Sequence, residues 1–218
     1  MKTSVFIFVL LLCLGPLSAR TDDVSGAFSY PLSAETRGRF NSVCGALAEH
    51  PFVKGNFEQT KTLSRLKRTL VSRGNFIIAA DMGMVWETLR PFPSTMTVGR
   101  DFIIQQAASG SRTKIDALGN ETFLRLSAVI SAVFSGNSQK LLDNFEIFFT
   151  GAEGGWIVGL VPFEQSIRSF ANRIVMRGDS VIRSINLYEN NGDTITYILS
   201  NHVFPGALSP IEKALFSD

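Results

Sequence analysis

Residues 82–98 read MGMVWETLRPFPSTMTV, a short run that combines Met, Trp and Phe with two prolines. Met84 and Trp86 alternate with Val85 and Glu87, which is the period of two that a β-strand requires. Two prolines then interrupt the run, and a further strand is expected after them. The stretch therefore predicts two neighbouring strands that place Met, Trp and other large apolar side chains on one face.

Alternating apolar and polar residues recur through most of the chain, so strands are its dominant expected element. Asn191-Gly192 lies between two such runs and predicts a hairpin turn. The basic segment 63–69 is expected at an edge or turn, in contact with water. The expected strands are residues 53–60, 70–79, 84–88, 95–98, 102–106, 145–149, 156–160, 173–177, 181–188 and 194–200.

Helical periodicity appears in two long segments and a short one. The first begins at Ser33, with Glu35 in its first turn, and the second spans 120–135. The third is expected after Ser209, where Ser-Pro-Ile-Glu forms a capping box. The apolar faces of the two long segments consist of Phe40, Val43, Cys44 and Leu47, and of Phe123, Leu126, Ile130, Val133 and Phe134.

An antiparallel sheet of this kind buries one face, and another layer must cover that face. We therefore expect an α+β fold in which a long antiparallel meander forms a curved sheet capped by helices. The sequence contains no internal repeat and no linker that would divide the chain. Residues 20–218 are expected to form a single domain with a sizeable core.

The first residues have the features of a secretory signal peptide. Lys2 gives a positive start, residues 5–12 are apolar, and Leu-Ser-Ala at 17–19 offers a cleavage site. The apolar run is too short to cross a bilayer as a helix. We expect residues 1–19 to be removed and the remainder to be a soluble exported protein.

Composition and charge argue against several classes of function. The formal charge is +2 and falls further without Lys2, so neither nucleic acid nor an anionic membrane is an expected partner. Cys44 is the only cysteine outside the signal segment, which excludes an internal disulfide and favours a buried apolar role. The 18 Phe far exceed the 3 Tyr and 2 Trp, a balance that favours dry apolar surface over a sugar-binding platform.

The sequence contains no motif for catalysis, metal binding or phosphate binding. His50 and His202 lie far apart, and neither has a sequence neighbour suited to metal binding or catalysis. Glu58 and Glu87 fall on expected strands, where two carboxylates on the solvent face of a sheet are the usual case. We therefore expect no catalytic residue, no metal and no cofactor, and an enzyme is not the expected function.

Three stretches together resemble the LolA family of outer-membrane lipoprotein carriers. Residues 53–63 read VKGNFEQTKTL and resemble the opening strand of the family with its Phe-x-Gln. Residues 73–98 resemble the Gly-x-Phe strand, the Trp-bearing strand and the return strand after proline. Residues 144–199 resemble the second half, in which a strand pair leads to Leu-x-Pro, a short helix and a hairpin at Asn-Gly-Asp. The chain is most similar to a divergent LolA-like branch that reads Gly-x-x-Trp and Pro-Phe-Pro-Ser-Thr.

The resemblance implies an unclosed β-barrel with a helical lid over a hydrophobic cavity. It implies a periplasmic carrier of acylated lipoproteins, or of another lipid or glycolipid, that takes its cargo from an inner-membrane ABC transporter and delivers it to an outer-membrane acceptor. We expect such a carrier to be a monomer. Well-known members of the family latch the lid with the arginine of an Arg-Pro pair before the aromatic strand. This chain has Ala80-Asp81 there, so the same latch is not expected.

The apolar face of the expected sheet would line the cavity, and the second helix would be the lid. The same pattern would also arise from a core that leaves no room for a ligand. A lipid-sensing or partner-binding module of the same fold, without transfer activity, is the alternative function. The expected cavity residues are Val53, Phe57, Phe76, Ile78, Met84, Trp86, Met96 and Val98, and the expected lid residues are Phe123, Leu126, Ile130 and Phe134.

Overall fold

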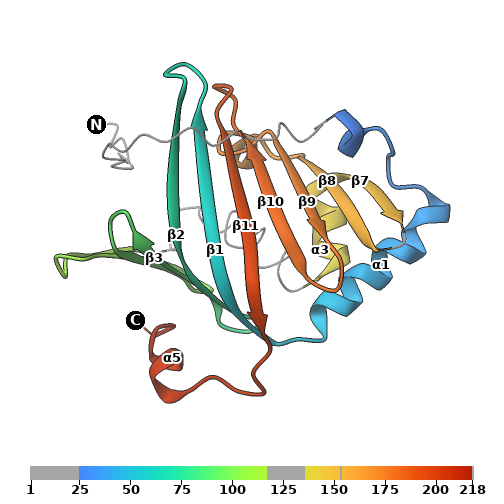
Figure 1. Ribbon diagram of the computed structural model, residues 1–218. Helices are drawn as coiled ribbons and strands as arrows, with labels where there is room; N and C mark the ends of the chain where they lie inside the picture. The colour runs from blue at the N-terminus through green and yellow to red at the C-terminus, as the bar shows by residue number, and fades with distance from the viewer. Residues whose placement is uncertain (1–24, 117–135, 153, 218) are drawn as a thin grey trace.

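The computed structural model describes residues 25–116, 136–152 and 154–217 (Figure 1). In this part of the chain, 11 strands form one antiparallel sheet in the order β6-β5-β4-β3-β2-β1-β11-β10-β9-β8-β7. The strands are β1 (Phe52–Leu63), β2 (Arg68–Ala79), β3 (Gly83–Arg90), β4 (Ser94–Val98), β5 (Phe102–Ala107), β6 (Arg112–Asp116), β7 (Phe145–Ala152), β8 (Gly155–Pro162), β9 (Arg173–Gly178), β10 (Ile182–Tyr188) and β11 (Thr194–Val203).

The strand order includes one pairing that the sequence pattern did not predict. The sheet consists of two meanders, β1 to β6 and β7 to β11, which join where β1 pairs with β11. The terminal strands of the sheet, β6 and β7, do not pair with each other, so the barrel stays unclosed. The predicted α+β fold with an open antiparallel sheet is therefore confirmed.

The predicted strands are all present, and their bounds differ from the prediction by a few residues. The structure also contains one strand that was not predicted. This strand is β6, whose residues Arg112–Asp116 read RTKID and lack an apolar face. The basic turn between β1 and β2 is confirmed at residues 64–67, although β2 already begins at Arg68. The hairpin at Asn191-Gly192 is also confirmed, and Gly192 takes a positive φ of 85° there.

Five short or medium helices accompany the sheet in the described residues. α1 begins after Ser33, whose hydroxyl accepts a hydrogen bond from the Thr36 amide, and α5 begins after Ser209 in a capping box with Glu212. Both helices were predicted; the short α3 was not. The predicted helix at 120–135 and the predicted signal peptide lie outside the described residues. The helices are η1 (Ser25–Phe28), α1 (Ala34–Ala48), α3 (Ser138–Asn144), α4 (Gln165–Arg168) and α5 (Pro210–Ala214).

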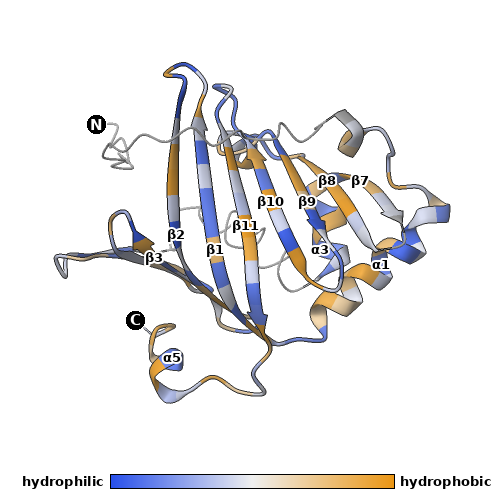
Figure 2. Ribbon diagram, in the orientation of Figure 1, coloured by the Kyte–Doolittle hydropathy of each residue, from blue (hydrophilic) through white to orange (hydrophobic). Residues whose placement is uncertain are grey.

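The two faces of the sheet have different neighbours. α1 and α3 contact each other and β7, and the face they cover is called the inner face here. α5 lies against the opposite, outer face, where Leu208 and Phe216 pack on Ala79 and Val85 (Figure 1). Figure 2 shows hydrophilic and hydrophobic residues alternating along β1, β11 and β10. The period of two in the sequence therefore sorts polar and apolar side chains between these two faces.

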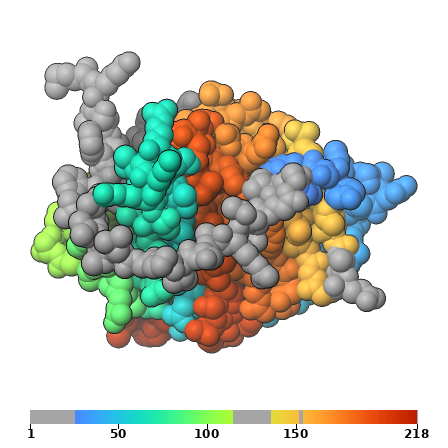
Figure 3. Space-filling view, turned by 45° about the horizontal axis from the view of Figure 1, so that its top comes forward, coloured from blue at the N-terminus to red at the C-terminus, as the bar shows by residue number. Residues whose placement is uncertain are grey.

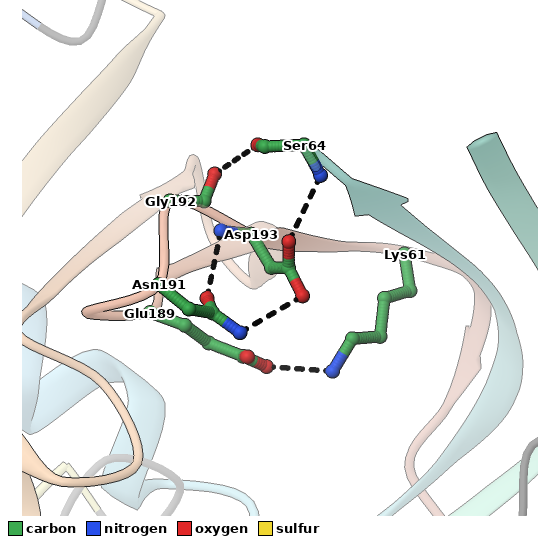
Figure 4. A network of polar contacts seen from close by, with 6 residues as sticks. All are labelled: Lys61, Ser64, Glu189, Asn191, Gly192 and Asp193. Carbon is green, nitrogen blue, oxygen red and sulfur yellow. Dashed lines mark hydrogen bonds and ion pairs between the residues drawn. The ribbon is translucent and has the colours of Figure 1, made fainter. Parts of the chain in front are cut away.

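A polar network joins the two meanders at one end of the β1–β11 pair (Figure 4). The Ser64 amide donates to the buried carboxylate of Asp193 at 2.9 Å, and the Ser64 hydroxyl contacts the Gly192 carbonyl oxygen. Lys61 and Glu189 form an ion pair at 2.8 Å. The turn between β1 and β2 thus lies beside the turn between β10 and β11, as Figure 3 also shows.

Candidate functional site

The inner face carries one continuous apolar cluster, and all eight side chains predicted to line a cavity belong to it. Strand register explains why they meet, since Trp86 on β3 pairs with Phe76 on β2 and with Met96 on β4. Paired residues place their side chains on the same face of a sheet. Phe57, Phe76, Ile78, Met84, Trp86 and Val98 are buried, and Val53 and Met96 are partly buried.

Four aromatic side chains from four strands form the centre of this region. The rings of Phe57 and Trp86 stack with their centroids 4.1 Å apart. The centroids of Phe76 and Trp86 are 6.0 Å apart, and the planes of these two rings differ by 21°. Tyr197 of β11 meets Trp86 edge to face at 5.2 Å. Burial raises the pKa of Tyr197 to about 12, with the nearby Glu189 adding to the effect, so its hydroxyl stays neutral. We call these four residues the aromatic cluster.

Two strand glycines create the space that the aromatic cluster occupies. A Cβ on Gly55 would lie 2.7 Å from Phe76 Cζ, and Gly55 pairs with Phe76 across β1 and β2. A Cβ on Gly74 would lie 2.8 Å from Phe57 Cε1 and would collide with the Glu87 carbonyl oxygen. Each glycine therefore leaves room for an aromatic ring on the neighbouring strand.

The apolar inner face extends far beyond the eight predicted residues. It continues over β11, β10, β9, β8 and β7, where alternation again places large apolar side chains on this face, with a register shift between Ile182 and Ser184 on β10. The sequence pattern identifies these residues as strand residues, but only the pairing of β1 with β11 brings them next to the aromatic cluster. The buried members are Phe145, Ile147, Phe149, Trp156, Val158, Leu160, Ile174, Met176, Ile182, Ile185 and Leu199.

α1 packs against the β7 end of this face. Phe40 is fully buried and meets Phe149 edge to face at 5.8 Å, which confirms the predicted apolar face of the helix. Cys44, one turn further, is 4% exposed, and burial raises its pKa to about 11. A thiol in this state is a small apolar core residue, as predicted. The predicted lid residues Phe123, Leu126, Ile130 and Phe134 lie outside the described residues.

A small cavity lies between the end of α1 and the inner face. Its volume is about 30 Å³, and Leu47, Val53, Phe76 and Leu199 are among the side chains that line it. This is about the volume of one water molecule.

Both histidines line the same cavity but form no catalytic arrangement with each other. His50 stacks on Phe204 at 3.9 Å, and His202 meets Phe76 edge to face at 5.8 Å. Burial, followed by the charge of Arg183, lowers the pKa of His202, so its imidazole is neutral at pH 7. Among the described residues, no three side chains of His, Cys, Asp or Glu come together as a metal site. Also within those residues, no helix has the length and hydrophobicity needed to span a bilayer.

No family model matches the sequence, and no curated protein matches it either. Several solved structures have a similar backbone fold. One is a DUF1329 family protein from Desulfovibrio piger, with a TM-score of 0.48, 10% identity, and coverage of 87% of this chain and 98% of that chain. Another is a LolA superfamily protein from Nitrosomonas europaea, with a TM-score of 0.44, 7% identity, and coverage of 80% and 96% respectively.

The complex of MucA and MucB from Pseudomonas aeruginosa is a third similar structure. Its TM-score is 0.44 at 10% identity, and the match covers 82% of this chain and 60% of that chain. At identities of 7–13% and TM-scores below 0.5, these matches describe a similarity in backbone fold alone. The function of this protein therefore has to be argued from its own residues.

Proposed function

We propose that the part of the inner face formed by β1 to β4 binds the acyl chains of a lipoprotein or another lipid, and that the protein carries this cargo between membranes. The observation that supports the proposal is the aromatic cluster, which continues without a polar break into the apolar residues of β4 and β11. Unbranched Met84 and Met96 flank it, and flexible thioether side chains adapt to chains of different shape. The face is therefore chemically suited to a hydrocarbon ligand.

The energetics require an apolar site of this kind. Each methylene removed from water contributes about 0.8 kcal/mol, so a sixteen-carbon chain left in water costs on the order of 12 kcal/mol. A few hydrogen bonds of about 1 kcal/mol each do not offset that cost. A carrier must surround the chain with apolar side chains and must bury those side chains when no cargo is present. The buried state of Phe57, Phe76 and Trp86 meets the second requirement.

The small volume of the inner cavity defines what binding must involve. At about 30 Å³ it does not hold a fatty acyl chain, so cargo enters by separating side chains that now touch. In our proposal the chain enters over β1 to β4, where the aromatic cluster lies. The periplasmic location, the inner-membrane ABC transporter as donor and the outer-membrane acceptor are further parts of the proposal, and they come from the resemblance to the LolA family.

Tryptophan quenching by a brominated fatty acid tests the proposed face directly. The chain has 2 Trp, Trp86 in the aromatic cluster and Trp156 on β8. Trp156→Phe leaves Trp86 as the only tryptophan, and Trp86→Phe leaves Trp156. Dibromostearate should quench the fluorescence of the first variant strongly, because bromine quenches on contact, and should affect the second much less. Equal quenching of both, or none, would contradict the proposed site.

Transfer between vesicles distinguishes a carrier from a sensor of the same fold. Donor vesicles containing a fluorescent acylated peptide are mixed with acceptor vesicles, with and without the protein. A carrier should accelerate transfer in proportion to its concentration, and Trp86→Glu should abolish the acceleration. Quenching without transfer would instead support a lipid-sensing or partner-binding module. Lipid extraction and mass spectrometry of the purified protein would identify the cargo.

A further inference from the structure

A second and much larger pocket lies on the outer face, between the sheet and α5. Its volume is about 400 Å³, which falls within the range of small-molecule sites. Its floor consists of side chains from β1, β2, β3 and β4, and the end of β11 and α5 form its walls. Phe76 is the one member of the aromatic cluster among the lining residues, and its pairing with Trp86 places its side chain on the inner face. The pocket is therefore separate from the proposed lipid face.

A row of side-chain amides crosses the floor of this outer pocket. Asn201 Nδ2 donates to Asn56 Oδ1 at 2.7 Å, and Asn56 Nδ2 donates to Asn75 Oδ1 at 2.8 Å. Asn75 Nδ2 then donates to the Glu87 carboxylate at 2.8 Å. The four residues come from four adjacent strands. Register pairs Asn56 with Asn75 and Asn75 with Glu87, and Asn201 follows Ser200, the residue that pairs with Asn56. The row runs in one direction and ends at a negative charge.

Glu87 is half-buried at the end of this row, and its partner is a neutral amide. Among the ion pairs formed by the described residues, none involves Glu87. The other acid of the pocket, Glu212 on α5, is paired with Lys54 at 2.6 Å. Lys54 is thereby neutralised, and Glu87 supplies the net charge of the pocket. A site with this charge favours a cation over an anion.

The rest of the pocket is apolar. Ile77 and Val85 lie on the floor next to the amide row, and Leu215 faces them from the end of α5. The Thr97 hydroxyl donates to the Leu215 carbonyl oxygen at 3.1 Å, which fixes this wall to β4. The pocket therefore presents a carboxylate and amides on one side and aliphatic side chains on the other. This division matches a ligand with one charged end and one apolar end.

We propose that the outer pocket binds a small ligand that carries a primary ammonium group on a short apolar body. The ammonium donates to the free oxygen of Glu87 and to the amide oxygens at the row, and the apolar body packs against Ile77, Val85 and Leu215. Three donors on an ammonium suit a row of acceptor oxygens that a neutral alcohol would satisfy only in part. This site does not depend on the proposed function of the inner face.

Calorimetric titration with three six-carbon probes tests the proposal. Hexylammonium, hexanol and hexanoate share an apolar body and differ in charge. Hexylammonium should bind at least about tenfold more tightly than hexanol, since hydrogen bonds to charged groups are the stronger ones. Hexanoate should bind most weakly. In NMR spectra, hexylammonium should shift the side-chain amide signals of Asn56, Asn75 and Asn201.

Glu87→Gln is the matched variant because glutamine keeps the acceptor for Asn75 and removes only the charge. It should weaken hexylammonium binding about tenfold or more and leave hexanol binding unchanged. Glu58→Gln is the control: Glu58 lies on β1, is paired with Arg73 at 2.6 Å and does not line the pocket. It should bind hexylammonium as the native protein does. The proposal is overturned if hexylammonium does not bind at millimolar concentration, if hexanoate binds more tightly, or if Glu87→Gln binds it as well as the native protein.

Discussion

The indole of Trp86 on β3 stacks on the ring of Phe57 on β1, although β2 lies between these two strands. The ring centroids are 4.1 Å apart and the planes differ by 26°. The contact is possible because Gly74 on β2, which pairs with Phe57, has no side chain to separate them. A single glycine in the intervening strand thus determines how the proposed lipid face is packed.

Gly74→Ala should destabilise the protein by about 1–3 kcal/mol or more, because the new Cβ meets both Phe57 and the backbone of Glu87. Urea unfolding followed by circular dichroism measures the change. Gly38→Ala is the control, since Gly38 lies in α1 and a Cβ added there would meet open space. That substitution should stabilise the protein by about 0.5–1 kcal/mol, because alanine favours helix. Equal effects of the two substitutions would show that the space at Gly74 does not matter.

Cys44 should react very slowly with thiol reagents in the folded protein. With a pKa of about 11, on the order of one thiol in a thousand is ionised at pH 8, and the side chain is also buried. In a Cys13→Ser background, the reaction with an aromatic disulfide should become fast only in denaturant. Rapid reaction under native conditions would mean that α1 separates readily from β7, and the rate in the presence of fatty acid would report whether cargo opens this end.

Asp193 should be the most important residue of the polar network between the two meanders. Its carboxylate is 8% exposed and accepts hydrogen bonds from the Ser64 amide and from Asn191 Nδ2. Asp193→Ala leaves these donors without their acceptor, and we expect a loss of about 1–3 kcal/mol in the free energy of unfolding. Asp143→Ala serves as the control, since Asp143 is exposed and its side chain accepts a hydrogen bond from Gln139 within α3. Its effect should stay within about 0.5 kcal/mol.

The docking of α5 should depend on pH only in strongly acidic solution. The hydrogen bond from Lys54, with further ones from Ser209, lowers the pKa of Glu212 from 4.5 to about 2. Because the folded pKa is the lower one, the ion pair contributes fully above about pH 4.5, and its contribution is lost as the pH falls through 2. Hydrogen exchange of the backbone amides in α5 measures how firmly the helix is docked at each pH. Glu212→Gln should increase the exchange at pH 5–7, whereas Glu35→Gln, at the start of α1, should leave it unchanged.

Much of the fold could be predicted from local patterns. Alternation at residues 53–60 and 84–88 predicted the strands and the shared face of Phe57 and Trp86. Ser33, with Glu35 in the first turn, and the capping box at Ser209 predicted where two helices begin. The pairing of β1 with β11 could not be predicted in this way, because it joins Phe57 to Leu199 across most of the sequence. For the same reason, Tyr197 was not recognised as part of the aromatic cluster. The row of Asn201, Asn56 and Asn75 depends on that pairing too.

The central position of the β1–β11 pair also affects how the protein folds. Each meander is built from contacts between strands that are neighbours in sequence. The pairing of β1 with β11 instead closes a loop of well over a hundred residues. Such a long closure is entropically unfavourable and slows folding. The first meander can form early, yet its β1 edge stays unpaired until Thr194–Val203 has been synthesised. During that interval the unpaired edge of β1 is open to pairing with another chain, which is a route to aggregation.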